Sequence, residues 1–443
     1  MTKNTPINSE IVKSKLAALN ISDMDKASIR EVVQVVNMIE AETGQKYVRM
    51  EMGVPGLPPA QVGVKAEIEA LKNGVASIYP NINGIPEIKT EAARFVKSFM
   101  NIDVKPENCI PTCGSMQGTY SLFQVAASIS EEQDTALFID PGFPVQKQQF
   151  MVMGEKFESF DVYNFRGEKL REKLESYLSK GNINSIIYSN PNNPTWICFT
   201  EDELKTIGEL ANKYKVIVME DLAYFGMDFR KDLSKPGEPP YQASVANYTD
   251  NFVLFISASK IFSYAGQRIA VVIMSDKVFN LNSPKLEARF KIKGFGNAVV
   301  YRVLYALSSG VAHSAQHAMA AMLKAANDGT FDFVSEVKVY AEKAEVMKEL
   351  FLANGFKILY DKDVDQLISD GFYFTICYPG MIAGELLYEM LFYGISGITL
   401  QSTGSTMEGI RACVSPVHPS QFGDLKERLE QFYRDHKIIE NKK

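Results

Sequence analysis

Short apolar runs alternate with amphipathic helix patterns between about residues 60 and 320. The runs are TALFID (135–140), NSIIYS (184–189), KVIVME (215–220), FVLFIS (252–257) and RIAVVIM (268–274). Continuous apolar strands separated by helices are typical of a mostly parallel sheet that is covered on both faces. This pattern predicts an α/β fold for the middle of the chain.

Two stretches outside these runs have apolar residues at helical spacing. Residues 28–43 begin with Ser28 and Glu31 at the spacing of a capping box, and Gly44 follows as a residue type that ends helices. Residues 336–355 have the pattern of a long, charged, amphipathic helix. We predict a helix in each stretch.

The length of the chain indicates more than one packing unit. With 443 residues it exceeds the size of one small domain, and the region after residue 365 reads as a smaller α+β unit. We predict a large domain over residues 60–322 and a small domain formed by residues 1–59 and 323–443. Residues 230–250 read as a long loop after a strand, and such loops are often functional.

The composition is that of an ordinary globular protein, with 46% hydrophobic and 23% charged residues. The net charge is −6, and no long block of like charges is present. Neither a nucleic-acid tail nor a polybasic membrane patch is therefore predicted. The N-terminus lacks the apolar segment of a secretory signal, and the apolar runs are too short to span a bilayer. We expect no nucleic-acid or membrane partner.

The cysteines and histidines give no metal-binding pattern. The five cysteines form no CxxC pair, and their odd number and scatter suit a reducing cytoplasm. His313 and His317 have i,i+4 spacing, but the glutamate of an HEXXH motif is missing. We predict a cytoplasmic protein with no bound metal.

Four of the predicted strands run directly into polar or turn-forming clusters. The clusters are PGFP (141–144), NPNNPT (190–195), DLAYF (221–225) and SASK (257–260). Because the carboxyl ends of parallel strands lie at one edge of a sheet, where ligands bind, we expect these clusters to meet. The residues that we expect to come together there are Asn193, Asp221, Tyr224 and Lys260.

An anion site is predicted beside them. Residues 111–128, PTCGSMQGTYSLFQVAAS, are a Gly-rich turn that enters a helix. The free N–H groups and the helix dipole at such a start favour a phosphate. Ser257 and Arg268 are placed to add a hydroxyl and a guanidinium to the same phosphate.

Pyridoxal phosphate (PLP) is the cofactor that this combination of groups fits. A lysine holds PLP as a Schiff base and moves protons. A carboxylate keeps the pyridine nitrogen protonated, so that the ring accepts electrons. A phenol and an amide donate to the ring oxygen and lower the pKa of the imine. Phe143, in PGFP, is an aromatic side chain that could cover one ring face.

These residues resemble the fold-type I PLP enzymes of the aspartate-aminotransferase-like class I/II group. The similar segments include Gly53 in EMGVPGLP, YPNINGIPEIK (79–89), CGSMQG (113–118), SASKIFSYAGQR (257–268) and GIRACVS (409–415). The resemblance covers nearly the whole chain. It implies a mostly parallel central sheet with helices on both faces and a smaller α+β domain.

The resemblance also implies the role of each cofactor-binding residue. Lys260 would carry the cofactor, and Asp221 would pair with the pyridine nitrogen. Asn193 and Tyr224 would contact the ring oxygen. The residues implied to hold the phosphate are Gly114, Ser115, Met116, Ser257 and Arg268.

Substrate and partner follow from the same resemblance. Arg411 would bind the substrate α-carboxylate, with Asn193 and the backbone of Gly53 beside it. Tyr79 would reach the phosphate of a neighbouring subunit, which makes the expected active unit a homodimer. The chain departs from the family at Trp196, where glycine is usual. This side chain either narrows the pocket or packs in the core, and we expect packing because large aromatic residues are mostly structural.

The resemblance implies an aminotransferase, which moves an amino group between an L-amino acid and a 2-oxo acid. A β-lyase or decarboxylase uses the same site residues and stays open as an alternative. A non-catalytic, PLP-sensing regulator would carry an added DNA-binding domain. Only a short segment with one clear helix and no basic stripe precedes Gly53, which argues against a regulator. The motifs do not name the amino acid.

Overall fold

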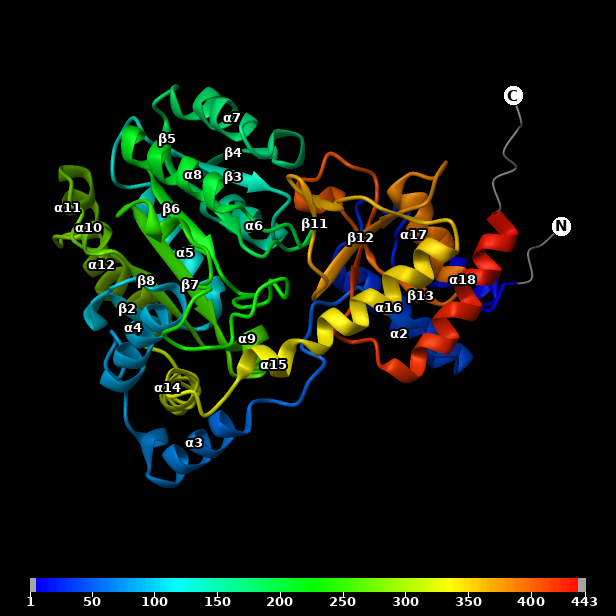
Figure 1. Ribbon diagram of the computed structural model, residues 1–443, viewed down its shortest axis with the longest axis horizontal. Coiled ribbons are helices and arrows are strands. Elements are labelled where there is room, and N and C mark those ends of the chain that lie inside the picture. Colours follow the sequence, from blue (N-terminus) through cyan, green and yellow to red (C-terminus); the bar gives the residue numbers. More distant parts are fainter. Residues whose placement is uncertain (1–4, 437–443) are drawn as a thin grey trace.

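The computed structural model describes residues 5–436, which form a larger part built on a seven-stranded sheet and a smaller part beside it (Figure 1). Helices α15 and α16 run from the larger part into the smaller one (Figure 1). The molecule has the predicted α/β fold with a mostly parallel sheet. Our domain boundaries at residues 60 and 322 stay predictions.

The strand order in the large sheet is β2-β8-β7-β6-β5-β3-β4. Strands β3 to β7 are mutually parallel, whereas β8 is antiparallel to both of its neighbours, β7 and β2. Two reversals restore the direction, so β2 ends at the same edge as the parallel strands. The strands are β2 (Cys109–Thr112), β3 (Thr135–Asp140), β4 (Lys156–Asp161), β5 (Ile183–Ser189), β6 (Ile217–Asp221), β7 (Phe252–Ser257) and β8 (Ala270–Met274).

Helices cover both faces of this sheet, as the continuous apolar runs predict. In β3, Leu137 and Ile139 belong to one apolar core, which also contains residues of α4, α7, α8 and α14. Ala136 and Phe138 belong to another, which contains residues of α5, α6 and the segment from α10 to η6. Successive side chains point to opposite faces of a strand. The whole run is therefore buried, because each face has its own layer of helices.

The helices of the larger part differ widely in length. They are α3 (Gln61–Lys72), η1 (Val75–Ser77), α4 (Pro86–Met100), η2 (Pro106–Asn108), α5 (Gly114–Ala126), α6 (Pro144–Met153), η3 (Tyr163–Phe165), α7 (Lys169–Leu178), α8 (Glu201–Tyr214), η4 (Val245–Asn247), α9 (Ala258–Ile261), η5 (Ala265–Gln267), α10 (Asp276–Phe279), α11 (Pro284–Phe290), α12 (Phe295–Ala298), η6 (Val299–Leu304), α13 (Tyr305–Ser308) and α14 (His313–Asn327).

The smaller part joins the two ends of the chain in one apolar core. Helices α1, α2, α16, α17 and α18 contribute buried residues to this core, including Val36, Phe351 and Phe432, and strands such as β12 and β15 add to it. A four-stranded sheet of order β14-β15-β12-β9 lies within it. The elements are α1 (Ser9–Ala18), α2 (Ile29–Thr43), β1 (Val48–Arg49), α15 (Phe333–Val337), α16 (Val339–Ala353), β9 (Lys357–Ile358), β10 (Lys362–Asp363), β11 (Gln366–Leu367), β12 (Tyr373–Cys377), α17 (Ala383–Phe392), β13 (Ile395–Ser396), β14 (Ile398–Thr399), η7 (Gln401–Thr403), β15 (Ile410–Cys413), η8 (Pro419–Gln421) and α18 (Phe422–His436).

Local chemistry set the ends of several elements. Both bonds of the predicted capping box between Ser28 and Glu31 are present at the start of α2, and Gly44 ends the helix in a left-handed conformation with φ +71°. Strand β8, predicted over 268–274, begins two residues later than we predicted. Arg268 has φ +52°, which strand backbone does not adopt, so β8 starts only at Ala270.

One other prediction needed correction, and two strands of the large sheet were missed. The helix predicted over 336–355 is two helices, α15 and α16, which are separated at Lys338 and end at Ala353. Strands β2 and β4 were not predicted, because the first is only four residues long and the second, KFESFD, is partly exposed and polar. Within residues 5–436, no helix has the length and apolar character needed to cross a membrane.

Candidate functional site

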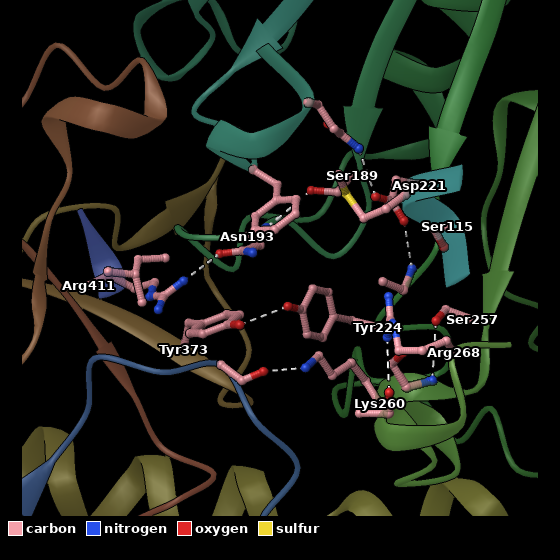
Figure 2. Close-up of a pocket in the computed structure, with 18 residues that line it drawn as sticks. Ser115, Ser189, Asn193, Asp221, Tyr224, Ser257, Lys260, Arg268, Tyr373 and Arg411 are labelled. Carbon is pink, nitrogen blue, oxygen red and sulfur yellow. Dashed lines mark hydrogen bonds between the residues drawn. The ribbon is translucent and has the colours of Figure 1, made fainter. Parts of the chain in front are cut away.

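A cavity of about 240 Å³ lies where the strand ends meet the smaller part (Figure 2). Most of the residues singled out from the sequence line it, although they come from distant segments. These are Gly53, Ser115, Met116, Phe143, Asn193, Asp221, Tyr224, Ser257, Lys260, Arg268 and Arg411. Figure 2 shows Arg268 and Arg411 on opposite sides of this space, with the two tyrosines Tyr224 and Tyr373 between them.

Lys260 enters the cavity from α9, directly after β7. Its ammonium group donates a hydrogen bond to the carbonyl oxygen of Gly53. Burial lowers the pKa of Lys260 to about 8, and the nearby guanidinium groups of Arg411 and Arg268 act in the same direction. A pKa this low gives a much larger fraction of neutral amine at neutral pH than an exposed lysine has. The neutral amine is the form that attacks a carbonyl group.

Asp221 is the last residue of β6 and is 8% exposed. Its carboxylate accepts hydrogen bonds from the backbone N–H of Ala223 at 3.2 Å and from Nε2 of Gln146 at 3.1 Å. Burial raises the pKa of Asp221 to about 6. Within the described chain, no lysine or arginine forms an ion pair with this carboxylate. A protonated ring nitrogen would supply the missing positive charge, so this position fits the pyridine of PLP.

A cradle for an anion lies at the start of α5, on the same side of the cavity as Asp221 (Figure 2). Gly114 has φ +67°, and a Cβ there would lie 2.5 Å from Nη2 of Arg268. The Oγ of Ser115 is buried and has no hydrogen-bond partner among residues 5–436. Ser257 Oγ accepts from the N–H of Ser259 at 3.2 Å, which leaves its own proton free to donate. The Ser115 hydroxyl, the start of α5 and the Arg268 guanidinium together fit the phosphate of PLP.

Arg411 and Asn193 form the third side of the cavity. Nη1 of Arg411 donates to Oδ1 of Asn193 at 3.3 Å, and Nη2 donates to the carbonyl of Glu51 at 2.6 Å. Nε of Arg411 is buried and has no hydrogen-bond partner in the described part of the chain. An unpaired guanidinium N–H inside a cavity favours an anionic ligand, since leaving it unpaired costs free energy.

The Asn-rich loop after β5 is folded on itself and presents Asn193 to the cavity. Asn192 turns away, because its Nδ2 donates to the carbonyl of Pro141 at 2.8 Å and its Oδ1 accepts from the hydroxyl of Thr195 at 2.7 Å. The backbone N–H of Asn193 is held by Ser189 Oγ at 3.2 Å. Adjacent asparagines therefore have different tasks: the first holds the loop, and the second lines the site.

Trp196 packs in the core, as expected. It is 0% exposed and does not line the cavity. Its indole N–H donates to Ser369 Oγ at 3.0 Å, and its ring lies edge-on to Tyr224 with 5.3 Å between the ring centres. The backbone of Trp196 has φ +67°, a left-handed conformation that glycine adopts without steric cost. The indole thus supports the tyrosine from behind.

Two predicted residues lie outside the lining. Gly114 sits one residue before Ser115, against Arg268. Tyr79 is 89% exposed on the loop after η1, away from the cavity of its own chain. Its role at a neighbouring subunit stays a prediction.

Sequence reasoning missed several lining residues, of which Gln146 and Tyr373 make the most specific contacts. Gln146 bonds to Asp221, and its place in the first turn of the helix after PGFP was a usable signal, because that turn lies at the same sheet edge. Tyr373 begins β12 in the smaller part, and nothing in its local sequence marks it. The other residues that we did not predict are Ile29, Ser189, Ala223, Ser259 and Ala265.

The sequence matches the family described as aminotransferase class I and II over residues 46–375, well over half of the chain. It is 24% identical over 327 residues to the LL-diaminopimelate aminotransferase of Natranaerobius thermophilus. This alignment covers 73% of this chain and 76% of that protein. It is 25% identical to a probable aspartate aminotransferase of Methanocaldococcus jannaschii, covering 52% of this chain and 58% of the relative.

Solved structures share the fold. The aspartate aminotransferase of Thermotoga maritima superposes with a TM-score of 0.74 over 93% of this chain and 98% of its own, at 18% identity. A double mutant of the Thermus thermophilus aspartate aminotransferase gives a TM-score of 0.73 over 96% of this chain and 99% of its own, also at 18% identity. The family match and the shared fold agree with the geometry of the cavity: this chain belongs to the class I and II aminotransferases, a family of PLP-dependent enzymes.

Proposed function

We propose that the protein is an aminotransferase that moves an amino group between an L-amino acid and a 2-oxo acid. The observation that carries the proposal is one cavity that combines three groups: a lysine of lowered pKa, a buried carboxylate and an arginine. Among the residues that the structure describes, the carboxylate has no counterion and one N–H of the arginine has no partner. Transamination needs all three: a base at the substrate Cα, a partner for the ring nitrogen and an anchor for the α-carboxylate.

Bound PLP supplies an electron-withdrawing ring that stabilises negative charge at the substrate Cα. The residues of this chain do the rest. Asp221 holds the proton on the ring nitrogen, and Gln146 and the N–H of Ala223 orient its carboxylate. Lys260 removes a proton from Cα and returns one, which its pKa of about 8 suits because proton transfer is fastest when the pKa lies near the working pH.

The test of this function is a panel of amino acids mixed one at a time with holoenzyme and a 2-oxo acid. A transaminase forms a new amino acid from the oxo acid and leaves the oxo acid of the donor. Release of free ammonia or of carbon dioxide with each turnover would instead show the β-lyase or decarboxylase. The same panel identifies the donor, which the motifs leave open.

Arg411 is proposed as the α-carboxylate anchor. A guanidinium makes two parallel hydrogen bonds to a carboxylate, which an ammonium group cannot copy. We expect Arg411→Lys to raise the Michaelis constant about 10- to 100-fold for every amino acid that reacts, since bonds to charged groups contribute about 1.5–3 kcal/mol. The rate should fall as well, because the carboxylate also orients the bond that breaks. Steady-state kinetics on the reactive amino acids measure both effects.

Arg428→Lys is the matched control, because Arg428 also donates to backbone carbonyls, those of Gly394 and Lys46, but lies outside the cavity. It should leave the Michaelis constants unchanged. Amines without a carboxylate should be poor substrates of the parent and little affected by Arg411→Lys. A simple amine that reacts as well as the best amino acid would rule out this role for Arg411.

The active unit is proposed to be a homodimer in which Tyr79 completes the partner's site. Exposed apolar side chains near the anion cradle support this, namely Ile78, Tyr79, Tyr305 and Leu307. The Ile78 carbonyl lies 3.1 Å from Nδ1 of His313, the first residue of α14. Gln117 of α5 donates to Ser308 of α13 at 2.8 Å, which ties this surface to the cradle. A second copy of the chain would cover the exposed aromatic and aliphatic groups.

Mixing Tyr79→Phe chains with Lys260→Ala chains tests the shared site. A hybrid dimer would contain one site with Lys260 of one chain and Tyr79 of the other, free of both substitutions. We therefore expect activity to rise on mixing above the sum of the two parents. If activity stays strictly additive after subunit exchange has been verified by mass, the site is not shared.

The proposed cytoplasmic location is supported by the five cysteines, none of which forms a disulfide.

A further inference from the structure

Two buried tyrosines form a hydroxyl pair at the centre of the cavity. The hydroxyl oxygens of Tyr224, after β6, and Tyr373, at the start of β12, lie 2.8 Å apart (Figure 2). The residues are 4% and 2% exposed, respectively. Within residues 5–436, each hydroxyl has the other as its hydrogen-bond partner. The pair thus joins the larger part to the smaller part inside the site.

The pair leaves one proton unused. Burial raises the pKa of both phenols above the ordinary value, so both keep their protons at neutral pH. Two hydroxyls carry two protons, and the bond between them uses one. When Tyr373 donates, the spare proton is that of Tyr224. This arrangement satisfies an acceptor placed against Tyr224, which is where the family resemblance of the sequence places the ring oxygen of PLP.

The surroundings of Tyr373 fix its hydroxyl in place. A Cβ at residue 53 would lie 2.1 Å from that hydroxyl, so Gly53 gives it room. The guanidinium carbon of Arg411 lies 4.7 Å from the centre of the Tyr373 ring. A cation over a phenol ring is attracted to it and withdraws electron density, which strengthens the phenol as a donor. The Trp196 ring packs against both tyrosines and limits their movement.

We propose that Tyr373 is a positioning residue whose hydroxyl donates to Tyr224 and thereby directs and strengthens the hydrogen bond from Tyr224 to the ring oxygen of PLP. The proposal rests on the proposed function, because it needs PLP in this cavity. A hydrogen bond received by a hydroxyl makes that hydroxyl a stronger donor. A stronger donor at the ring oxygen lowers the pKa of the nitrogen that joins Lys260 to the cofactor.

The test is a pH titration of the visible absorbance of holoenzyme, which reports the protonation of that nitrogen independently of turnover. We expect Tyr373→Phe to raise the titration midpoint by about half a pH unit and Tyr224→Phe to raise it by more. The double variant should have the midpoint of Tyr224→Phe alone, because Tyr373 acts through Tyr224. A Tyr373 residue that serves only packing would leave the midpoint in place.

A second variant should shift the titration midpoint in the opposite direction while keeping the packing of the ring. Replacing Tyr373 by 3-fluorotyrosine makes the phenol more acidic and a stronger donor, so the midpoint should fall. Tyr393→Phe is the matched control. Tyr393 is also buried, and the variant loses a hydrogen bond of 2.8 Å to Asp435, but neither residue lines the cavity. The midpoint of this variant should equal that of the parent.

The outcomes separate this proposal from the one on which it rests. A parent protein that gains no visible band with PLP would overturn the proposed function. A parent band that Tyr224→Phe shifts, but that Tyr373→Phe and 3-fluorotyrosine leave unchanged, would overturn the role of Tyr373 alone. If the shift in the double variant equals the sum of the shifts in the two single variants, Tyr373 acts without Tyr224. That result would also overturn the proposed role of Tyr373.

Discussion

Lys260→Ala should abolish turnover while the protein still folds. The alanine cannot attack the carbonyl of PLP, and no other amine lines the cavity among the described residues. Loss of the positioned base alone should lower the rate by about 10²- to 10⁴-fold. The variant should also lack the visible band of covalently held cofactor. Rate measurements at saturating amino acid and an absorbance spectrum of the purified protein test both expectations.

Lys343→Ala is the control for a buried lysine. Lys343 is 8% exposed, burial lowers its pKa, and its ammonium group donates to a backbone carbonyl, that of Ser415, at 2.8 Å. It therefore shares the environment of Lys260 but lies outside the cavity. We expect it to keep the visible band and turnover within a few fold, with some loss of stability. Turnover by Lys260→Ala within about tenfold of the parent would contradict the assignment.

Asp221→Asn should bind PLP and lose on the order of 10³-fold in rate, the scale seen when a charge-stabilising group is removed from an active site. An amide has nearly the same shape as the carboxylate and can still contact Gln146. It carries no negative charge, so it cannot hold the proton on the ring nitrogen, and the ring then accepts electrons poorly. Single-turnover measurements of proton removal from the amino acid separate this step from substrate binding.

Glu220→Gln tests whether any buried carboxylate on β6 would serve. Glu220 is adjacent in the strand, and its side chain therefore points to the opposite face of the sheet. It is 0% exposed, burial raises its pKa to about 7, and it accepts bonds from Val245 and Asn190. We expect Glu220→Gln to change the free energy of unfolding but to keep the rate within about tenfold. A rate for Asp221→Asn equal to that of Glu220→Gln would argue against the role of Asp221.

The sequence by itself determined the elements whose signals are local. The runs TALFID and FVLFIS became strands with the predicted bounds, 135–140 and 252–257, because a buried strand covered on both faces requires apolar residues throughout. The capping box at Ser28 formed because its donors and acceptors lie within four residues of each other. The clusters that follow the parallel strands could also be placed at one edge of the sheet. Strands that alternate with helices along the chain run in the same direction, so their carboxyl ends lie together.

Only the tertiary structure decided which of these local elements touch. The antiparallel direction of β8 depends on how η5 and Arg268 turn the chain after Lys260, which no apolar pattern records. Gln146 reaches Asp221 across 75 residues of sequence, and Tyr373 reaches Tyr224 across 149. Such contacts are fixed by the packing of whole helices and strands, whereas periodicity reports only the face that a residue occupies. The line of contacts from Arg411 through Tyr373 to Tyr224 is therefore a property of the folded protein.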